Sequence, residues 1–598
     1  MNIQSKWLGA ILLLAWFSSA RAAVFYVDVN SPNPTPPYAM WSTASTDIQS
    51  AVDAASDGDM IWVNDGVYQT GGRVVYGSLT NRVVINKAVH VQSVNGPSAT
   101  TIQGNGPNSD SAVRCVYMTN FASLTGFTLT GGATRSAGDR VKENSGGGVW
   151  CEFTNSLLMN CVLVSNSAAA YGGGGFSGAC SNCVFSRNVA LDGGGASSNL
   201  LNDCTLVGNG SLFGLGAGAF GSVLNYCTVA WNTNIGIFDC VANGCIISNN
   251  FCDSSYSGAG AAISSLTNCA IVNNTSMGGG GGVAGPCVLT SCLVEGNVSV
   301  FGPGGGGALF STLNNSIIAW NTCNGPGSAG GAGYECTFNN CLICRNSDRT
   351  GFTGAYESTL NNCTITGQTN GYAISDCNLT NCIVYDNFIN YQPGPSQFVN
   401  CCTVPLPSYA HSDFENFTND PNFLNAAAGD FHLQSNSPCI NAGNNSSVTD
   451  LTDLDGNPRI VGGTVDIGAY EYQTPSSILS YAWAQQYGLP TDGSADFADS
   501  DHTGMSNWQK WIAGLNPTNP ASVLAMLPPA STNNATGVTV SWDSVNTRKY
   551  YLLRATNLFT QPTFSAIQSN LVGQAGTTSF TDASATNSGP YFYQVGIQ

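Results

Sequence analysis

The pattern that decides the fold is six residues long: Cys, any residue, an aliphatic residue or Phe, two further residues, and Asn. It begins as CVLVSN at Cys161–Asn166 and CVFSRN at Cys183–Asn188. It continues as CTLVGN from Cys204, CTVAWN from Cys227, CIISNN from Cys245, CAIVNN from Cys269, CLVEGN from Cys292, SIIAWN from Ser316, CLICRN from Cys341, CTITGQ from Cys363 and CIVYDN from Cys382. A glycine-rich tract precedes nearly every unit, and the units recur about every 22 residues, which is typical of a solenoid repeat.

A repeat of this length with strand-like pieces predicts one coil of a three-sided β-solenoid, because helical repeats need about 33 residues or more. With the Cys numbered zero, apolar residues recur at positions −3 and +2, and small residues at −5. The pairs −5/−3 and 0/+2 each have the period of two that inward-facing strand residues require. Position +5 is Asn in ten of the eleven units. We expect it at a corner, in left-handed geometry, bonding to the Asn of the next coil as a ladder.

The chain has 23 cysteines, and most of them belong to the repeat. Ser316 replaces Cys at position zero, so the column is interpreted as small buried residues rather than as bridges. Coils about 4.8 Å apart would still allow some neighbouring pairs to oxidise. Cys180/Cys183 and Cys341/Cys344 have the spacing of a zinc or redox site, but they also fit the columns of the repeat.

Composition excludes several classes of protein. The formal charge is 17 − 35 = −18, which disfavours a nucleic-acid binder. The 43% hydrophobic content argues against disorder, and no Gly-X-Y period indicates collagen.

Residues 1–22 have the charge, apolar stretch and Ala20-Arg21-Ala22 site of a signal peptide, with a buried first helix as the alternative. We therefore expect a secreted or cell-surface protein, monomeric and with no membrane-spanning helix in the mature chain.

The repeat resembles right-handed parallel β-helix proteins of the pectin-lyase-like class. Its GGG and C-x-x-x-x-N units are also similar to the repeats of polymorphic outer-membrane proteins. Within residues 23–104, DIQSAVDAASDGDMIWVNDGVY from Asp47 resembles the helix-then-strand entry of pectinesterase-like β-helices. The resemblance implies an all-β fold with an N-terminal capping helix, followed by β-helix repeats over residues 105–429.

Three further segments follow the repeats. Residues 430–474 resemble the choice-of-anchor Q module, through SPCINAGN (from Ser437), DLDGNPRI (from Asp453) and VDIGAYEY (from Val465). Residues 475–530 resemble a calcium-loop segment in which Asp499, Asp501 and Thr503 are the candidate metal ligands. Lys510 stands where a bidentate Glu is needed, so a weak Ca²⁺ site and a plain structural linker are both open. Residues 531–598 have the alternating strands of a small fibronectin-III-like β-sandwich.

Candidate chemistry lies at position −6, which we place on the outside of the coil, between inward −7 and −5 neighbours. It is acidic on three successive coils, as Glu335, Glu357 and Asp376. Carboxylates about 5 or 10 Å apart bracket the separations used by glycosidases. The candidate catalytic residues are therefore these three, and the alternatives are a Ca²⁺ site or a hydrated acidic stripe.

Candidate ligand-binding residues are the flat side chains that sugars stack on and a nearby cation. They are Trp231, Trp320, Tyr334, Tyr356 and Arg345, with corner packing as the alternative for the two Trp residues. No certain cofactor is indicated.

Two functions remain open. The favoured one is a surface or secreted β-helix that binds a polysaccharide, a cell-surface glycan or a partner, as an adhesin or structural protein. The alternative is a lyase or glycoside hydrolase acting on an acidic polysaccharide through the carboxylate column. The scarcity of Lys and His in the repeat region disfavours an eliminative lyase.

Overall fold

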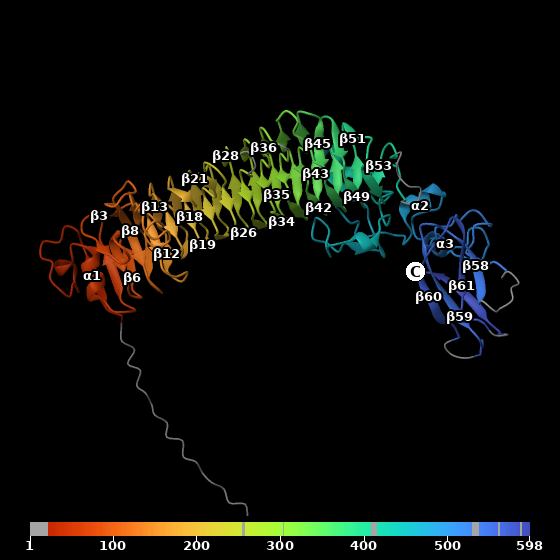
Figure 1. Cartoon of the computed structure of the whole chain (residues 1–598), viewed down its shortest axis with the longest axis horizontal. Helices are drawn as coiled ribbons and strands as arrows, with labels where there is room; N and C mark the ends of the chain where they lie inside the picture. Colours follow the sequence, from red (N-terminus) through yellow and green to blue (C-terminus); the bar gives the residue numbers. More distant parts are fainter. Residues whose placement is uncertain are drawn as a thin grey trace, which may run out of the picture. The chain divides into compact units, whose positions relative to one another are not determined.

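A computed structural model describes residues 22–253, 258–302, 304–407, 415–528, 537–559, 563–586 and 589–598. Residues 1–21 of the expected signal peptide lie outside these ranges. The chain divides into two units, residues 1–184 and 185–598, and each is described by itself. Both contain stacked coils of short parallel strands, so the predicted all-β parallel β-solenoid is confirmed (Figure 1).

Unit 1 starts with a strand and a capping helix. Helix α1 (Ile48–Ala54) begins at Asp47, whose side chain accepts a hydrogen bond from the Ser50 amide. Its apolar face, formed by Ile48, Ala51 and Val52, is buried, as the helical spacing of these residues predicts. A short 3-10 helix, η1 (Trp41–Thr43), precedes it. The predicted helix-then-strand entry is therefore present.

Three sheets form the coils of unit 1. The first contains β1 (Val24–Val27), β2 (Met60–Val63), β6 (His90–Ser93), β9 (Ser123–Thr125), β12 (Leu157–Met159) and β15 (Ala179–Ser181). The second contains β3 (Gly66–Tyr68), β7 (Thr100–Gln103), β10 (Thr128–Thr130) and β13 (Val162–Val164). The third contains β4 (Arg73–Val74), β5 (Thr80–Ile85), β8 (Val113–Met118), β11 (Val149–Cys151) and β14 (Gly175–Phe176).

Unit 2 repeats the arrangement with sheets that we call A, B and C. Sheet A contains β19 (Leu200–Asn202), β23 (Val223–Asn225), β26 (Val241–Asn243), β30 (Ser265–Thr267), β34 (Val288–Thr290), β38 (Thr312–Asn314), β42 (Thr337–Asn339), β46 (Thr359–Asn361), β49 (Asn378–Thr380) and β52 (Gln397–Val399). Sheet B contains β16 (Val184–Ser186), β20 (Thr205–Val207), β24 (Thr228–Ala230), β27 (Ile246–Ser248), β31 (Ala270–Val272), β35 (Leu293–Glu295), β39 (Ile317–Ala319), β43 (Leu342–Cys344), β47 (Thr364–Thr366), β50 (Ile383–Tyr385) and β53 (Cys402–Thr403).

Sheet C contains β18 (Ala196–Ser197), β22 (Ala219–Phe220), β25 (Ile237–Phe238), β29 (Ala261–Ala262), β33 (Val283–Ala284), β37 (Ala308–Leu309), β41 (Gly333–Tyr334), β45 (Phe352–Tyr356), β48 (Tyr372–Ser375) and β51 (Ile389–Tyr391). Extra strands pair between sheets B and C along the chain: β17 (Val189–Asp192) with β21 (Gly210–Leu215), and a ladder of β28 (Phe251–Cys252), β32 (Thr275–Ser276), β36 (Val298–Ser299), β40 (Thr322–Cys323) and β44 (Ser347–Asp348).

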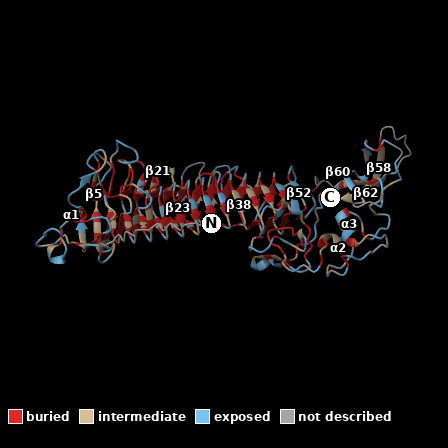
Figure 2. Ribbon diagram, turned by 90° about the horizontal axis from the view of Figure 1, so that it is seen from below, coloured by how far each residue is buried: buried red, intermediate tan, exposed pale blue. Residues whose placement is uncertain are grey.

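The core of unit 2 consists of the predicted columns. Position −3, represented by Leu266 and Phe338, and position +2, represented by Ile271 and Ile343, are fully buried. Figure 2 shows buried residues running through the stacked coils. All 23 cysteines are buried, as the small-residue interpretation predicts. Cys341 faces the core whereas Cys344 lies in a cluster on the outer side, so this pair is not arranged as a chelating site.

Left-handed backbone marks the three corners of each coil. In the coil around Cys341 these residues are Glu335, Asn340 and Arg345, at positions −6, −1 and +4. The prediction that the +5 Asn holds this conformation is therefore wrong by one residue. That Asn is buried instead, because the turn at +4 directs it inward.

The predicted Asn ladder is confirmed at position +5. The Asn250 side chain donates to Asn274 Oδ1 (2.9 Å) and to the Val229 carbonyl (3.0 Å), and it accepts from the side chain of Asn232 (2.9 Å). The same bonds recur from Asn209 to Asn321. Each buried corner therefore has its polar groups satisfied by the neighbouring coil.

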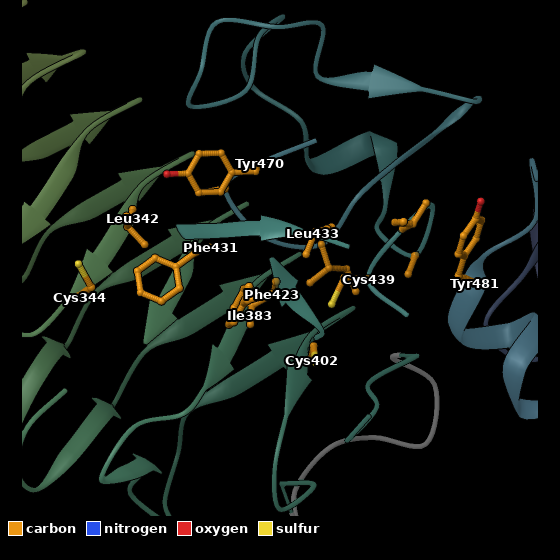
Figure 3. Close-up of a cluster of buried hydrophobic side chains, with 14 of the residues drawn as sticks. Leu342, Cys344, Ile383, Cys402, Phe423, Phe431, Leu433, Cys439, Tyr470 and Tyr481 are labelled. Atoms are coloured by element: carbon orange, nitrogen blue, oxygen red, sulfur yellow. The ribbon is translucent and has the colours of Figure 1, made fainter. Parts of the chain in front are cut away.

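The segment after the last coil packs on the outside of sheet B. We call residues 421–472 the docking module. It contains β54 (Phe423–Asn425), η2 (Ala426–Ala428), β55 (Asp430–Leu433), η3 (Asn445–Ser447), β56 (Ile460–Val461) and β57 (Thr464–Val465). Its buried apolar residues, including Phe431 and Ile467, form one cluster with the outward residues Leu342 and Ile383 of sheet B (Figure 3).

The C-terminal part contains two short helices and two antiparallel sheets. The helices are α2 (Tyr481–Gln486) and α3 (Asn507–Ala513). One sheet pairs β58 (Val538–Ser544) with β61 (Gly576–Asp582), and the other has the order β60 (Ser565–Val572), β59 (Lys549–Ala555), β62 (Phe592–Ile597). Trp542 and Tyr550 are buried in the small core of these sheets. Within the described ranges no helix has the length and apolarity needed to cross a bilayer.

Candidate functional site

The acidic column lies where sheet C turns into sheet A. Glu335 and Glu357 follow the paired residues Tyr334 and Tyr356, so they occupy the same corner of adjacent coils. Asp376 follows on the next coil. All three have left-handed backbone, and both Glu side chains are exposed. The three candidate catalytic residues therefore form one column on successive coils, as predicted.

The tyrosines beside the acidic column face outward. Gly333 points into the coil, since a Cβ there would lie 2.5 Å from the ring of Phe338. Tyr334, the next residue, therefore points out. From the sequence we expect position −7, which is Tyr334 here, to point inward, and this expectation is wrong. The left-handed residue at −6 interrupts the alternation of the strand, so the side chains at −8 and −5 both face the interior of the coil.

The outward rings form a platform. Tyr334 and Tyr356 stack with centroids 5.5 Å apart and an interplanar angle of 13°. Phe352 meets the edge of Tyr356 at 5.2 Å and stacks on Tyr372 at 6.1 Å. Phe310 contacts Tyr334 edge-on at 6.0 Å. We call Phe310, Tyr334, Phe352, Tyr356 and Tyr372 the aromatic platform.

A cavity of about 270 Å³ opens beside the platform. Its lining combines rings, hydroxyls and one carboxylate: Gly327, Ser328, Ala329, Tyr334, Thr350, Phe352, Tyr356 and Glu357. The buried carboxylate of Asp348 holds one wall in place, accepting from the Thr350 hydroxyl (2.6 Å) and from the amide of Gly351 (2.9 Å). The Asp348 carboxylate therefore stabilises the turn that lines the cavity.

Electrostatics keep the Tyr334 phenol protonated. Burial and the neighbouring carboxylates of Glu335 and Glu357 raise its pKa to about 12. The Tyr334 hydroxyl lies 3.4 Å from Glu357 Oε2 as a donor. No Lys, Arg or His occurs among the residues that line the cavity. The site therefore offers flat apolar surface, hydrogen-bond donors and acceptors, and a negative field.

The remaining candidate ligand-binding residues lie at a different corner, after sheet B. Trp231 and Trp320 are exposed, at 65% and 51%, and both have left-handed backbone. The Arg345 guanidinium lies 5.3 Å above the ring of Trp320. The sequence pattern placed the two Trp residues at position +4 and the tyrosines beside the acidic residues, and the structure keeps these positions at different corners.

The candidate calcium loop has its acidic groups already engaged. Asp501 forms an ion pair with the buried ammonium of Lys510, and the Asp499 carboxylate accepts the amides of Thr503 (3.0 Å) and Gly504 (2.8 Å). The Thr503 hydroxyl donates to Asp501. These residues do not fit Ca²⁺, because Lys510 supplies the positive charge. Nowhere in the described ranges do three or more His, Cys, Asp or Glu residues gather as metal ligands would.

Sequence reasoning missed Phe310, Phe352 and Tyr372, along with the cavity residues Ser328 and Thr350. Phe352, Tyr372 and the two cavity residues lie in the variable stretch between repeats, where no fixed spacing identifies a face. Phe310 lies at position −6, where only the acidic residues were considered as candidates. The signal for the rings was their occurrence near the start or end of the sheet C strands in successive coils.

Comparison with known proteins gives no family. No family model matches the sequence, and no curated protein matches it. Similar solved structures include the pectate lyase Pel9A (13% identity, 75% of this chain and 96% of that one, TM-score 0.20) and XylC in complex with xylose (10%, 75% and 98%, TM-score 0.28). Another is PfbA, a surface adhesin of Streptococcus pneumoniae (10%, 59% and 86%, TM-score 0.21). At such identities a likeness concerns the fold alone, so the site is judged on its own residues.

Proposed function

We propose that this protein is an exported β-helix that binds a glycan at the aromatic platform. The observation that carries the proposal is the stacked pair Tyr334 and Tyr356 beside a cavity with hydroxyl and carboxylate groups. Sugar rings bind through flat apolar contact combined with hydrogen bonds from a few polar groups. The platform supplies the first, and the Glu357 carboxylate and the tyrosine hydroxyls supply the second.

The charge of the site indicates which glycans fit. Glu335, Glu357 and Asp376 lie along one side of the platform, and the cavity lining has no cation. A neutral polysaccharide or one that carries amino groups fits this field better than a polyuronate, which would need a bridging cation.

The test is binding of purified full-length protein to a panel of soluble glycans, by calorimetry. The panel is a neutral glucan, a partly deacetylated amino-sugar polymer, and a polyuronate with and without Ca²⁺. We expect Tyr356→Ala to weaken binding of the preferred glycan about tenfold, which corresponds to about 1.4 kcal/mol. Trp231→Ala is the matched control, since it removes an exposed ring from the other corner. Equal losses in both variants, or no binding by the wild type, would refute the proposal.

The same samples test catalysis by the carboxylate column. Glu335 and Glu357 are exposed, whereas general acid–base catalysis works best in a site that excludes water. We therefore expect the glycans to be recovered intact. New reducing ends or unsaturated uronate that disappear in Glu357→Gln would favour the hydrolase or lyase alternative instead.

A further inference from the structure

Two thiols from distant parts of the chain meet under the docking module. Cys402 lies on β53, in register with the outward residue Ile383 of β50. Cys439 is the only cysteine after residue 402. Both side chains are fully buried in the cluster between module and sheet, where both are labelled in Figure 3. The Cys402 thiol donates to the Asn419 carbonyl (3.2 Å), and burial together with the neighbouring Cys439 thiol raises the pKa of Cys402 well above its usual value.

The backbone around both residues is fixed. The Cys402 amide donates to the Cys382 carbonyl (2.9 Å) as part of sheet B. The Cys439 amide donates to the Ser437 hydroxyl (3.2 Å), and its carbonyl accepts from the Ile467 amide (3.0 Å). The fold therefore fixes the backbone positions of both cysteines.

The cysteines of the two repeat columns are arranged less favourably for bonding. In the position-zero column, adjacent thiols lie on parallel strands in register, about 4.8 Å apart with parallel Cα–Cβ bonds. A disulfide needs Cβ atoms about 3.5–4.5 Å apart, so closing one there requires backbone movement. At position −5, Cys alternates with Ser on successive coils, from Ser222 and Cys240 to Cys377 and Ser396, so its cysteines lie two coils apart. Cys402 and Cys439 belong to segments that share no register, so neither restriction applies.

We propose that Cys402 and Cys439 form a disulfide that fastens the docking module to the last coil of sheet B. Both S–H bonds break and one S–S bond forms, while two protons and two electrons pass to an oxidising disulfide, which becomes a pair of thiols. A secreted protein meets such oxidants in the compartments where disulfides form. Because the folded site is closed to solvent, the bond forms as the module docks.

The test is a map of free and bonded cysteines in the full chain, refolded with a mixture of reduced and oxidised glutathione. The protein is denatured without reductant, alkylated, digested and analysed by mass spectrometry. We expect one dominant cross-linked pair, joining the peptide with Cys402 to the peptide with Cys439. Cys439 alkylated in most molecules would overturn the proposal, as would Cys439 bonded mainly to another residue.

Cys401 provides a matched control because it is adjacent to Cys402 but faces the core. Cys401→Ser should keep the cross-link, and Cys402→Ser should abolish it. The ladder tolerates such a change, since Ser316 already occupies position zero in one coil. Fragment ions that separate residue 401 from residue 402 decide the assignment in the wild type even where a variant fails to fold.

Discussion

Single residues at the corners hold the backbone in a conformation that most side chains disfavour. In unit 2 the corner before sheet A contains Gly221, Asp239, Ile263, Gly285 and Phe310 in successive coils, all with positive φ. Left-handed geometry costs roughly 1–2 kcal/mol for an ordinary residue and almost nothing for Gly. The stacking of coils therefore imposes the corner on whatever residue occurs there.

Ile263 is the most strained of these residues, since it is β-branched at φ 50° and 46% exposed. We expect Ile263→Gly to stabilise the protein by about 1 kcal/mol, because it removes the strain and little packing. The midpoint of urea unfolding measures this. Val241→Gly is the control, since it is exposed but lies within β26, and it should destabilise by about 0.5–1 kcal/mol. A loss of stability in Ile263→Gly would contradict the strain argument.

For a buried residue of the Asn ladder, we expect substitution to destabilise the protein. Asn250→Ala leaves the amide and side-chain N–H of Asn232 and the Val229 carbonyl without partners. At about 1–3 kcal/mol for each unsatisfied group, we expect a loss of about 3 kcal/mol or more. Asn243→Ala on the outer face of the coil should change stability by less than about 1 kcal/mol. Similar losses in the two variants would mean that the ladder does not stabilise the coils.

At the level of elements, the repeat pattern predicted the stacked strands, the inward columns and helix α1. It could not predict which way Tyr334 points, because one left-handed residue shifts the strand alternation and no residue type marks it: Glu, Asp, Ser, Phe and Ile all occur there. The platform residue Phe352 was missed for a related reason, since β45 begins in a loop whose length varies between coils.

In helix α3, the single residue Lys510 decides whether the preceding loop can bind Ca²⁺. Lys510, in its last turn, occupies position 12 of a loop that starts at Asp499, and its ammonium pairs with Asp501. We expect Lys510→Glu to destabilise this region without metal, because it adds a buried carboxylate beside Asp501. With millimolar Ca²⁺ the variant should regain stability, since Glu at this position completes the ligand set. Thermal unfolding with Ca²⁺ or EDTA measures this, and the wild type should respond to neither. A variant indifferent to Ca²⁺ would show that the loop geometry, and not Lys510, excludes the metal.

At the level of the whole molecule, the docking module changes the surroundings of one outward position in sheet B. This position is 49% exposed at Ile246, whereas Leu342 and Ile383 are buried under the module. The sequence does not mark this difference, because an apolar residue in a strand looks the same whether it faces solvent, the core or a docked segment. The location of the module therefore needed coordinates, whereas the solenoid did not.

The docking module also contains an excess of buried acid. Arg459 is fully buried and pairs with Glu471 (3.1 Å), while the Asp466 carboxylate accepts the amides of Asn441 and Tyr472. Burial raises the pKa of Glu471 to about 9 and that of Asp466 to about 7. On the surface, burial opposes the charge of His432, but hydrogen bonds with Asp455 and Asp430 raise its pKa overall.

All three shifts have the same consequence for stability. A group whose pKa is higher in the folded state contributes stability at low pH and loses it as the pH rises through the folded value. We therefore expect the module to loosen progressively between pH 5 and about 9, with the loss from Asp466 complete near pH 7 and the loss from Glu471 complete near pH 9. Hydrogen exchange of residues 437–472 in the full chain, corrected for the intrinsic rate, measures this. Glu471→Gln should flatten the dependence, whereas Glu357→Gln, an exposed carboxyl at a coil corner, should leave it unchanged. Protection that rises between pH 5 and pH 9 would show that Arg459 keeps both carboxylates ionised. The module would then be stabilised by ion pairing and not by a proton retained on the carboxyl groups.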